Sequence, residues 1–246
     1  KAAPEWSYET GDIVRSVAVS ADGEYIVAGG KDDKIYLFGK DSSTPLWSYD
    51  SGAVVTSVSI SADGEYIAIG SSDMVRLFDK DSSTPLWSYE TGGDILSVAI
   101  SSDSEYIVAG SADEYIYFFE KDSSTPEWSY FTNNLVKSVA ISADGEYIVA
   151  GSDSHYVYLF EKNSSTPLWS YDTDSDVFSV DISGNGDKIV AGNIGGGFLY
   201  FGIDSSTPLR TSSHPGSWVE VSISKDGDWA TFGTNQNRVY LRTLSD

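Results

Sequence analysis

The sequence predicts an all-β fold in which one unit of four antiparallel strands is repeated six times. A ten-residue phrase, SADGEYIVAG at Ser20, returns with small changes at Ser61, Ser101, Ser142, Ser183 and Ser224. The glycine that ends the phrase falls at Gly29, Gly70, Gly110, Gly151, Gly192 and Gly233, so that successive spacings are 41, 40, 41, 41 and 41 residues. A fixed period of roughly 20–50 residues indicates a repeat architecture, in which each unit buries its apolar face against the next one.

Within one period, four short segments are rich in Val, Ile, Tyr, Phe or Trp, and Gly, Asp, Ser or Pro separates them. This composition predicts strands joined by tight turns. In the first period the segments are VRSVAVS from Val14, EYIVAG from Glu24, KIYLFG from Lys34 and PLWSYD from Pro45. Helical periodicity is absent. Four antiparallel strands in one such period make one blade of a β-propeller.

The two ends of the chain complete the count of strands. The chain opens with PEWSYET, a fourth-strand phrase, and closes with RVYLRTLSD, a third strand without a fourth. We therefore expect a single domain over 1–246, a six-bladed ring that the N-terminal strand closes by completing the last blade, which leaves no free edge strand. The expected blades are 10–50, 51–90, 91–131, 132–172, 173–213, and 214–246 together with 1–9.

The repeat also resembles known families. VRSVAVSADGEYIVAGGKDDKIYLFGK resembles the unit of WD-repeat β-propellers, and the stretch from Asp41 to Trp47 is similar to the D-x-x-T…W signature of quinoprotein-like repeats. Such mixed repeats look similar to archaeal surface or secreted propellers, which implies an extracellular or cell-surface location. Because the family's Trp-Asp pair is replaced, as by Phe38-Gly39, we expect packing to set the register of the blades. A quinone cofactor is not expected, since six blades fall short of the usual eight.

Composition excludes several classes of function. Fifteen basic residues against 37 acidic ones give a net charge of −22, which disfavours nucleic acid and anionic membranes as partners. Membrane insertion is not expected, because no apolar run reaches the length of about 18 residues that a spanning helix needs. The absence of cysteine excludes disulfides, thiol catalysis and Cys-bound metal. We expect a monomer.

A column of tryptophans recurs on the predicted outer strands, and we expect it to pack neighbouring blades together rather than to bind a ligand. Its members are Trp6, Trp47, Trp87, Trp128 and Trp169.

The copies differ mainly at the links that one face of a propeller would carry. The links between second and third strands read GKDDK, SSDM, SADEY, SDSHY, NIGGG and TNQNR, whereas SADGE and KDSST barely change. Just before a near-constant Ser-Val, one position also changes type in every copy. That position and one neighbour are the candidate binding residues at the channel mouth: Arg15, Thr56, Leu96, Lys137, Phe178, Val219 and Trp218. Arg15, Lys137, Phe178 and Trp218 are the expected anchors. Unconstrained drift is the alternative, because loops tolerate change.

No catalytic constellation is evident in the sequence. The arginines are scattered, and His155 and His214 stand in different blades without a Ser-His-Asp pattern. Gly195–Gly197 reads as a flexible turn. No cofactor is expected, although calcium is conceivable because the variable face is rich in acids such as Asp32 and Asp113. The nearest approach to a calcium motif is the pair Asp174 and Asp176, which we expect to be a weak candidate.

The sequence thus favours a non-enzymatic interaction propeller that presents a variable acidic face to a protein or glycan. The first alternative is a metal-dependent hydrolase, lyase or lactonase with its site in the central channel. The second is a structural spacer domain of a surface protein. The near-identity of the copies indicates recent amplification or deliberate consensus construction, between which the sequence does not decide.

Overall fold

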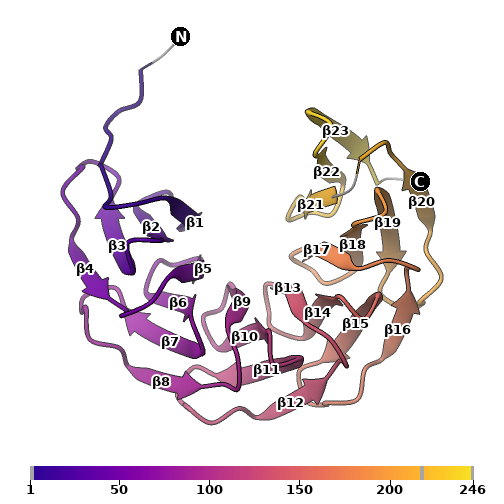
Figure 1. Ribbon diagram of the computed structural model, residues 1–246, viewed down its shortest axis with the longest axis horizontal. Coiled ribbons are helices and arrows are strands. Elements are labelled where there is room, and N and C mark those ends of the chain that lie inside the picture. The colour runs from indigo at the N-terminus through magenta and orange to yellow at the C-terminus, as the bar shows by residue number, and fades with distance from the viewer. Residues whose placement is uncertain (1–2, 217–218, 245–246) are drawn as a thin grey trace.

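A computed structural model describes residues 3–216 and 219–244, and in these ranges the chain forms 23 strands and no helix. The strands make six antiparallel sheets that stand side by side along an arc, with the first strand of each sheet innermost (Figure 1). Five sheets have four strands and the last has three. The predicted all-β fold of six blades is confirmed.

The sheets follow one another in chain order. The first contains β1 (Val14–Val19), β2 (Tyr25–Gly30), β3 (Lys34–Gly39) and β4 (Trp47–Asp50). The second contains β5 (Val55–Ile60), β6 (Tyr66–Ser71), β7 (Met74–Asp79) and β8 (Trp87–Glu90). The third contains β9 (Ile95–Ile100), β10 (Tyr106–Ser111), β11 (Tyr115–Glu120) and β12 (Trp128–Phe131). The fourth contains β13 (Val136–Ile141), β14 (Tyr147–Ser152), β15 (Tyr156–Glu161) and β16 (Trp169–Asp172). The fifth contains β17 (Val177–Ile182), β18 (Lys188–Asn193), β19 (Gly197–Gly202) and β20 (Arg210–Ser213). The sixth contains β21 (Val219–Ile223), β22 (Trp229–Thr234) and β23 (Arg238–Thr243).

The core lies between successive sheets rather than inside any one of them. One apolar cluster joins Val27 and Leu37 of the first sheet to Val55, Val58 and Ile67 of the second. Because both faces of a middle strand are covered by neighbouring sheets, β2 and its copies are apolar in nearly every position. Each blade is therefore stabilised mainly by contacts with the blades before and after it.

The SADG phrase, which changes little between copies, is a tight turn between the first two strands. The Ser20 hydroxyl donates to Asp22 Oδ1 at 2.6 Å and accepts the Tyr25 N–H at 3.1 Å. Gly23 has φ = 74°, a conformation that glycine adopts without steric cost. The phrase is therefore preserved for its local geometry.

The tryptophan column packs each outer strand against the following blade, as predicted. Trp47 stacks on Phe78 with ring centroids 5.6 Å apart, and its Nε1 donates to the Lys80 carbonyl at 2.7 Å. The same indole-to-carbonyl bond recurs in the other copies, for Trp6, Trp87, Trp128 and Trp169.

A second contact sets the register of the innermost strands. The Val58 N–H donates to the Ser16 hydroxyl of the preceding blade at 3.0 Å, and Val98 and Ser57 repeat the bond. Two further bonds of this kind bring Val139 to Ser97 and Val180 to Ser138. These bonds explain why the Ser-Val pair is nearly constant in the sequence.

The predicted closure of the ring by the N-terminal strand is not formed in this structure. In the described ranges, residues 3–9 do not pair with β23, and the first and sixth sheets face each other across the opening of the arc (Figure 1). Trp6 instead lies on Phe38 of the first sheet, with ring centroids 5.2 Å apart. The contact between Trp6 and Phe38 joins residues that are close in the sequence. Pairing of residues 3–9 with β23 would in contrast require the first and sixth sheets to come together.

Candidate binding face

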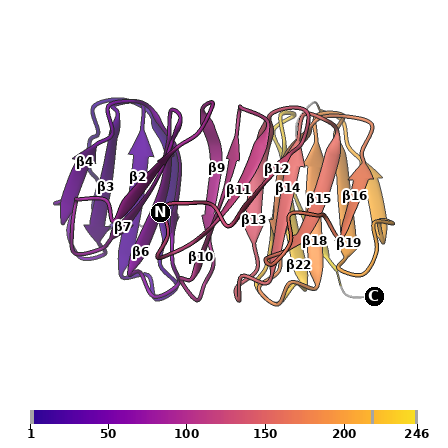
Figure 2. The ribbon, with the colours of Figure 1, turned by 90° about the horizontal axis from the view of Figure 1, so that it is seen from below.

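The strands run between two rims of loops (Figure 2). One rim carries the invariant SADG and KDSST links. The other, which we call the variable rim, carries the links between second and third strands and the links that enter each new blade. The variable column of the sequence lies on the first strands near the variable rim.

Each of the first five residues in that column is the extra residue of a β-bulge. In the first blade, Val14 pairs with Gly30 and Ser16 pairs with Gly29, so that Arg15 has no partner in β2. The same register shift isolates Thr56, Leu96, Lys137 and Phe178. A bulge re-aims the side chain of its extra residue and frees it from the pairing pattern. The variable column is thus a structural device repeated in five blades.

The sixth blade departs from this arrangement and corrects one prediction. Val219 pairs with Thr234, and Glu220 pairs with Gly233, without a register shift. Because the bulge is missing, strand alternation turns Val219 inward, where it is fully buried beside Gly192. Val219 therefore does not belong to the binding face. Trp218 lies outside the described residues.

The five bulge residues have different surroundings. Arg15 is exposed on β1, at the open end of the arc. Thr56 is bonded into the fold, since its hydroxyl lies 2.6 Å from the Ile95 carbonyl of the next blade and 3.0 Å from that of Gly70. Leu96 is half-buried. Thr56 therefore links two blades, and Arg15, Lys137 and Phe178 remain as candidate anchors.

A polar cluster surrounds Lys137 at the junction of the fourth and fifth blades. Lys137 Nζ lies 3.2 Å from Asp153 Oδ2, and His155 Nε2 lies 3.3 Å from Asp176 Oδ1. Burial raises the pKa of Asp153, and the charge of Lys137 offsets part of that rise. Asp153 Oδ1 is buried, and within the described part of the chain it has no hydrogen-bond partner. The buried oxygen of Asp153 is therefore an unsatisfied acceptor inside the cluster, beside the Lys137 ammonium.

Two other acids of the variable rim are structural. Asp32 Oδ2 accepts the Tyr36 hydroxyl at 2.7 Å and the Gly11 N–H at 2.9 Å, and Asp113 makes the same pair of bonds. Burial alone would raise the pKa of Asp32, but these hydrogen bonds outweigh it and hold that pKa below its usual value. Burial, followed by the bond to Asp113, raises the pKa of Tyr117. These carboxylates tie neighbouring links together and are not available to a ligand.

Phe178 lines a hollow near the rim. The hollow has a volume of about 500 Å³ and lies between the fifth and sixth blades; it is lined by Phe178, Glu220, Gly233, Thr234, Asn235, Asn237, Arg238 and Val239. Thr234 Oγ1 is buried in the described structure without a hydrogen-bond partner. Of these residues, the sequence pattern singles out only Phe178. The others belong to the sixth repeat, which differs from the other copies along its whole length.

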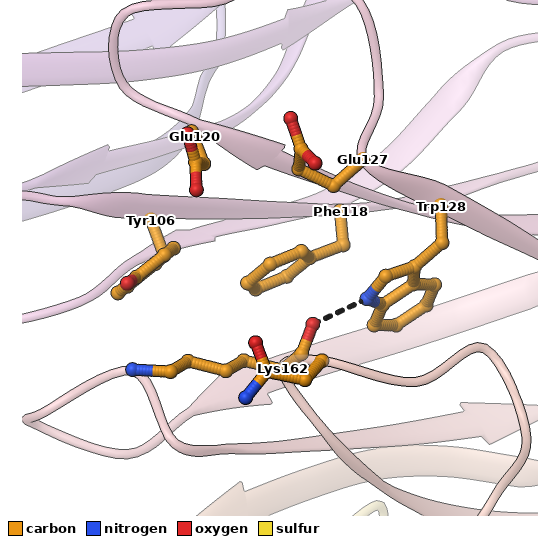
Figure 3. A pocket seen from close by; sticks show the side chains of 7 residues that line it. Tyr106, Phe118, Glu120, Glu127, Trp128 and Lys162 are labelled. Atoms are coloured by element: carbon orange, nitrogen blue, oxygen red, sulfur yellow. Dashed lines mark hydrogen bonds between the residues drawn. The ribbon is translucent and has the colours of Figure 1, made fainter.

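A smaller pocket lies on the outer side between the third and fourth blades, and the sequence reasoning missed it. It has a volume of about 170 Å³. Figure 3 shows Glu120 and Glu127 on one side of the Phe118 ring and Lys162 on the other. Glu127 stands where four other copies have leucine, namely Leu46, Leu86, Leu168 and Leu209, and where the N-terminal copy has Glu5. The replacement of leucine by glutamate was the signal in the sequence. Two carboxylates beside aromatic rings suit a cationic group.

Two families of repeat match the chain. The family model for the outer membrane protein assembly factor BamB matches residues 4–123, and that for the WD domain, G-beta repeat, matches residues 125–161. Together with the six antiparallel sheets, these matches support a propeller built of repeats similar to WD and quinoprotein-like repeats. No curated protein matches it at a significant level.

In residues 3–216 and 219–244, no three His, Asp or Glu side chains gather in a way that could hold a metal ion. The weak calcium candidates Asp174 and Asp176 are not part of such a group, and Asp176 Oδ1 lies 3.3 Å from His155 Nε2. The same ranges contain no helix with the length and hydropathy of a membrane span.

One buried acid of the propeller's inner strands yields a test of stability. Asp181 accepts the Ile223 N–H at 2.9 Å and the Ser222 hydroxyl at 3.1 Å. Burial raises its pKa despite these bonds. Ser59 makes the equivalent bond to the Ile100 N–H at 3.2 Å without a charge.

Asp181→Ser is therefore expected to raise the melting temperature at pH 7 by a few degrees, or about 1 kcal/mol. Because the folded pKa of Asp181 lies above the unfolded value, the wild-type carboxyl stabilises the fold fully only below the unfolded pKa, and that stability is lost as pH rises through the folded pKa. The increase in melting temperature that Asp181→Ser gives should therefore be smaller when it is measured below pH 4. A lower melting temperature at pH 7 would mean that the carboxylate's hydrogen bonds outweigh its burial.

Proposed function

We propose that this propeller is a non-enzymatic interaction scaffold that holds a partner protein or glycan against its variable rim, outside or at the surface of a cell. The observation that supports it best is the set of five bulges. The residues on either side of each bulge are nearly the same in the five blades, whereas the extra residue of the bulge differs from blade to blade.

The charge of the chain favours a partner with a basic surface. With a net charge of −22, the propeller attracts a cationic partner over distances of about a Debye length, roughly 8 Å at physiological salt. Association should therefore slow and weaken as salt rises.

Simultaneous replacement of Arg15, Lys137 and Phe178 by Ala is expected to reduce partner capture from the native source at least tenfold, because Arg and aromatic anchors dominate binding energy. The matched control replaces Thr44, Thr84 and Thr125 by Ala. These threonines are exposed on the invariant rim, so capture should be unchanged. Equal capture by wild type, rim variant and control would support a spacer role instead.

The metal-dependent enzyme is tested by melting the protein in excess Ca²⁺ and in excess chelator. The scaffold proposal expects the two melting temperatures to agree within about a degree. A specific site occupied at 100 times its dissociation constant adds about 2.7 kcal/mol of stability, which would appear as a rise of several degrees. Such a rise would favour the enzyme.

A further inference from the structure

We propose that the pocket between the third and fourth blades binds the guanidinium group of an arginine side chain that protrudes from a partner protein. The pocket has a volume of about 170 Å³ and is lined by two carboxylates and a row of aromatic rings (Figure 3). It lies at the rim that carries the SADG and KDSST links, opposite the variable rim. The inference therefore does not depend on the function proposed for the variable rim.

The pocket forms where the third strand of a blade turns into the fourth. Glu120 ends β11 and Glu127 directly precedes β12, so the two acids flank the KDSST link of the third blade. The backbone follows the other copies, because the Glu127 N–H donates to the Phe118 carbonyl at 2.9 Å as the Leu46 N–H donates to that of Leu37. What distinguishes the pocket is therefore its side chains.

Two replacements in the third blade coincide at this pocket. Phe118 stands where the first, second and fourth blades have Leu37, Leu77 and Leu159. Glu127 stands where four of the other copies have leucine. Among the blades whose four strands are consecutive in the sequence, the third alone has an acid both at the end of its third strand and just before its fourth. An additional ring and a second carboxylate thus occur together.

The aromatic side chains form a stack along the pocket. The Phe118 ring lies between those of Tyr106 and Trp128, with centroids 5.4 Å and 5.1 Å away and interplanar angles of 17° and 9°. Tyr106 and Trp128 are only half-buried, so their rings are accessible from the rim. A guanidinium group is planar and packs well on aromatic rings. The stack therefore offers it an apolar wall.

The protein does not neutralise the two carboxylates. Both are exposed, and within residues 3–216 and 219–244 neither Glu120 nor Glu127 makes an ion pair. Lys162 lines the opposite wall, but its ammonium pairs with Glu146 and lies 5.0 Å from the centroid of the Tyr106 ring. The negative charge of Glu120 and Glu127 is therefore left for a cation from outside the chain.

An arginine side chain fits these groups better than other cations do. Its guanidinium presents several N–H donors in a rigid fork, so one group can bond to both carboxylates while it packs against the rings. A lysine ammonium is compact and strongly hydrated, and it gains less from an apolar wall. Calcium takes roughly six to eight oxygen ligands, and in the described part of the chain Glu120 and Glu127 belong to no group of three acids.

The test is a titration of the whole chain with the tripeptide Gly-Arg-Gly, blocked at both ends, followed by the indole N–H signals in NMR spectra. Trp128 lines the pocket, and its Nε1–H donates to the Lys162 carbonyl at 2.7 Å. Trp169 is its equivalent in the fourth blade, where Leu168 replaces Glu127. We expect the Trp128 signal to shift to saturation while the Trp169 signal does not move. Spectra of Trp128→Phe and Trp169→Phe assign the two signals.

Two further peptides identify the chemistry of the ligand. Citrulline in place of arginine keeps the shape of the side chain without its charge, and that peptide should leave the Trp128 signal unchanged. Lysine in place of arginine should bind at least about threefold more weakly, because an ammonium group cannot pack flat against the rings. A shift of equal size with the citrulline peptide, or tighter binding of the lysine peptide, would overturn the proposal.

Matched variants separate the pocket from the overall charge of the chain. Glu127→Leu restores the leucine of other copies, so it should fold, and it should weaken the arginine peptide about fivefold, the upper end of what an exposed ion pair contributes. Glu120→Gln should act similarly. Glu161→Gln makes the same change of charge at the equivalent position of the fourth blade and should leave binding unchanged. Equal affinity in all variants, or an equal loss in Glu161→Gln, would mean that the peptide responds to net charge alone and that the pocket is not its site.

Discussion

Phe160→Ala is expected to lower the melting temperature by on the order of 10 °C. The ring of Phe160 is fully buried between the third and fourth blades, with its centroid 5.2 Å from that of Trp128 and 5.1 Å from that of Tyr130. Truncation of a buried Phe costs about 3–5 kcal/mol, because the cavity left behind refills only in part. In a chain of this size each kcal/mol corresponds to about 2–4 °C.

Phe131→Ala is the matched control, because that ring is 46% exposed at the end of β12. Calorimetry on both variants and on the wild type gives the comparison. A similar decrease in melting temperature in the two variants would mean that the contacts between blades do not provide most of the stability.

Gly192→Ala is the second variant expected to destabilise the fold strongly. An added Cβ would overlap the backbone carbonyl of Val219, in the following blade. A backbone atom cannot move aside as a side chain can, so the two blades must separate. Overpacking of this kind costs about 1–3 kcal/mol and occasionally more. We expect denaturant titration to show a lower midpoint with an unchanged slope.

Gly39→Ala supplies the comparison for Gly192→Ala. An added Cβ at Gly39 has nothing within 4 Å, and Gly39 does not have a positive φ. The midpoint should therefore stay within the error of the wild type. A large loss in Gly39→Ala would show that glycine is needed along the strands for a reason other than contact between blades.

The architecture was predictable because the same physical demands recur at every copy. Ser20 and Gly23 are kept for a turn, Gly29 is kept for the close approach of Val55, and Trp47 is kept for its contact with Phe78. Each of these demands is local or links adjacent copies, so one period of sequence contains enough information to define it.

The candidate site was predictable only in part. The sequence located the column of Arg15, Lys137 and Phe178, but strand alternation alone did not reveal that each residue is the extra member of a bulge. The loss of one bulge in the sixth blade turned Val219 inward, and no residue type signals that loss. A bulge depends on the pairing register of two strands, and a comparison of residue types between the copies does not reveal that register.

The roles of the acids were also beyond the sequence. Asp32 and Asp153 both look like exposed acids of the variable face. Asp32 is committed to Tyr36 and Gly11, whereas Asp153 retains an unpartnered oxygen. The difference arises from the groups that the fold brings to each carboxylate, which are Tyr36 and Gly11 at Asp32 and Lys137 at Asp153.

The outer strands β4, β8, β12 and β16 each dock on the blade that follows, and this gives the chain a direction of assembly. A nascent chain can add units one after another, each new blade completing the surface left by its predecessor, as in other arrays whose stability is set by nearest neighbours. Duplication of one whole period introduces no new kind of junction. Copy number can therefore change in a single genetic step, and the curvature of the arc then decides how many units make a circle.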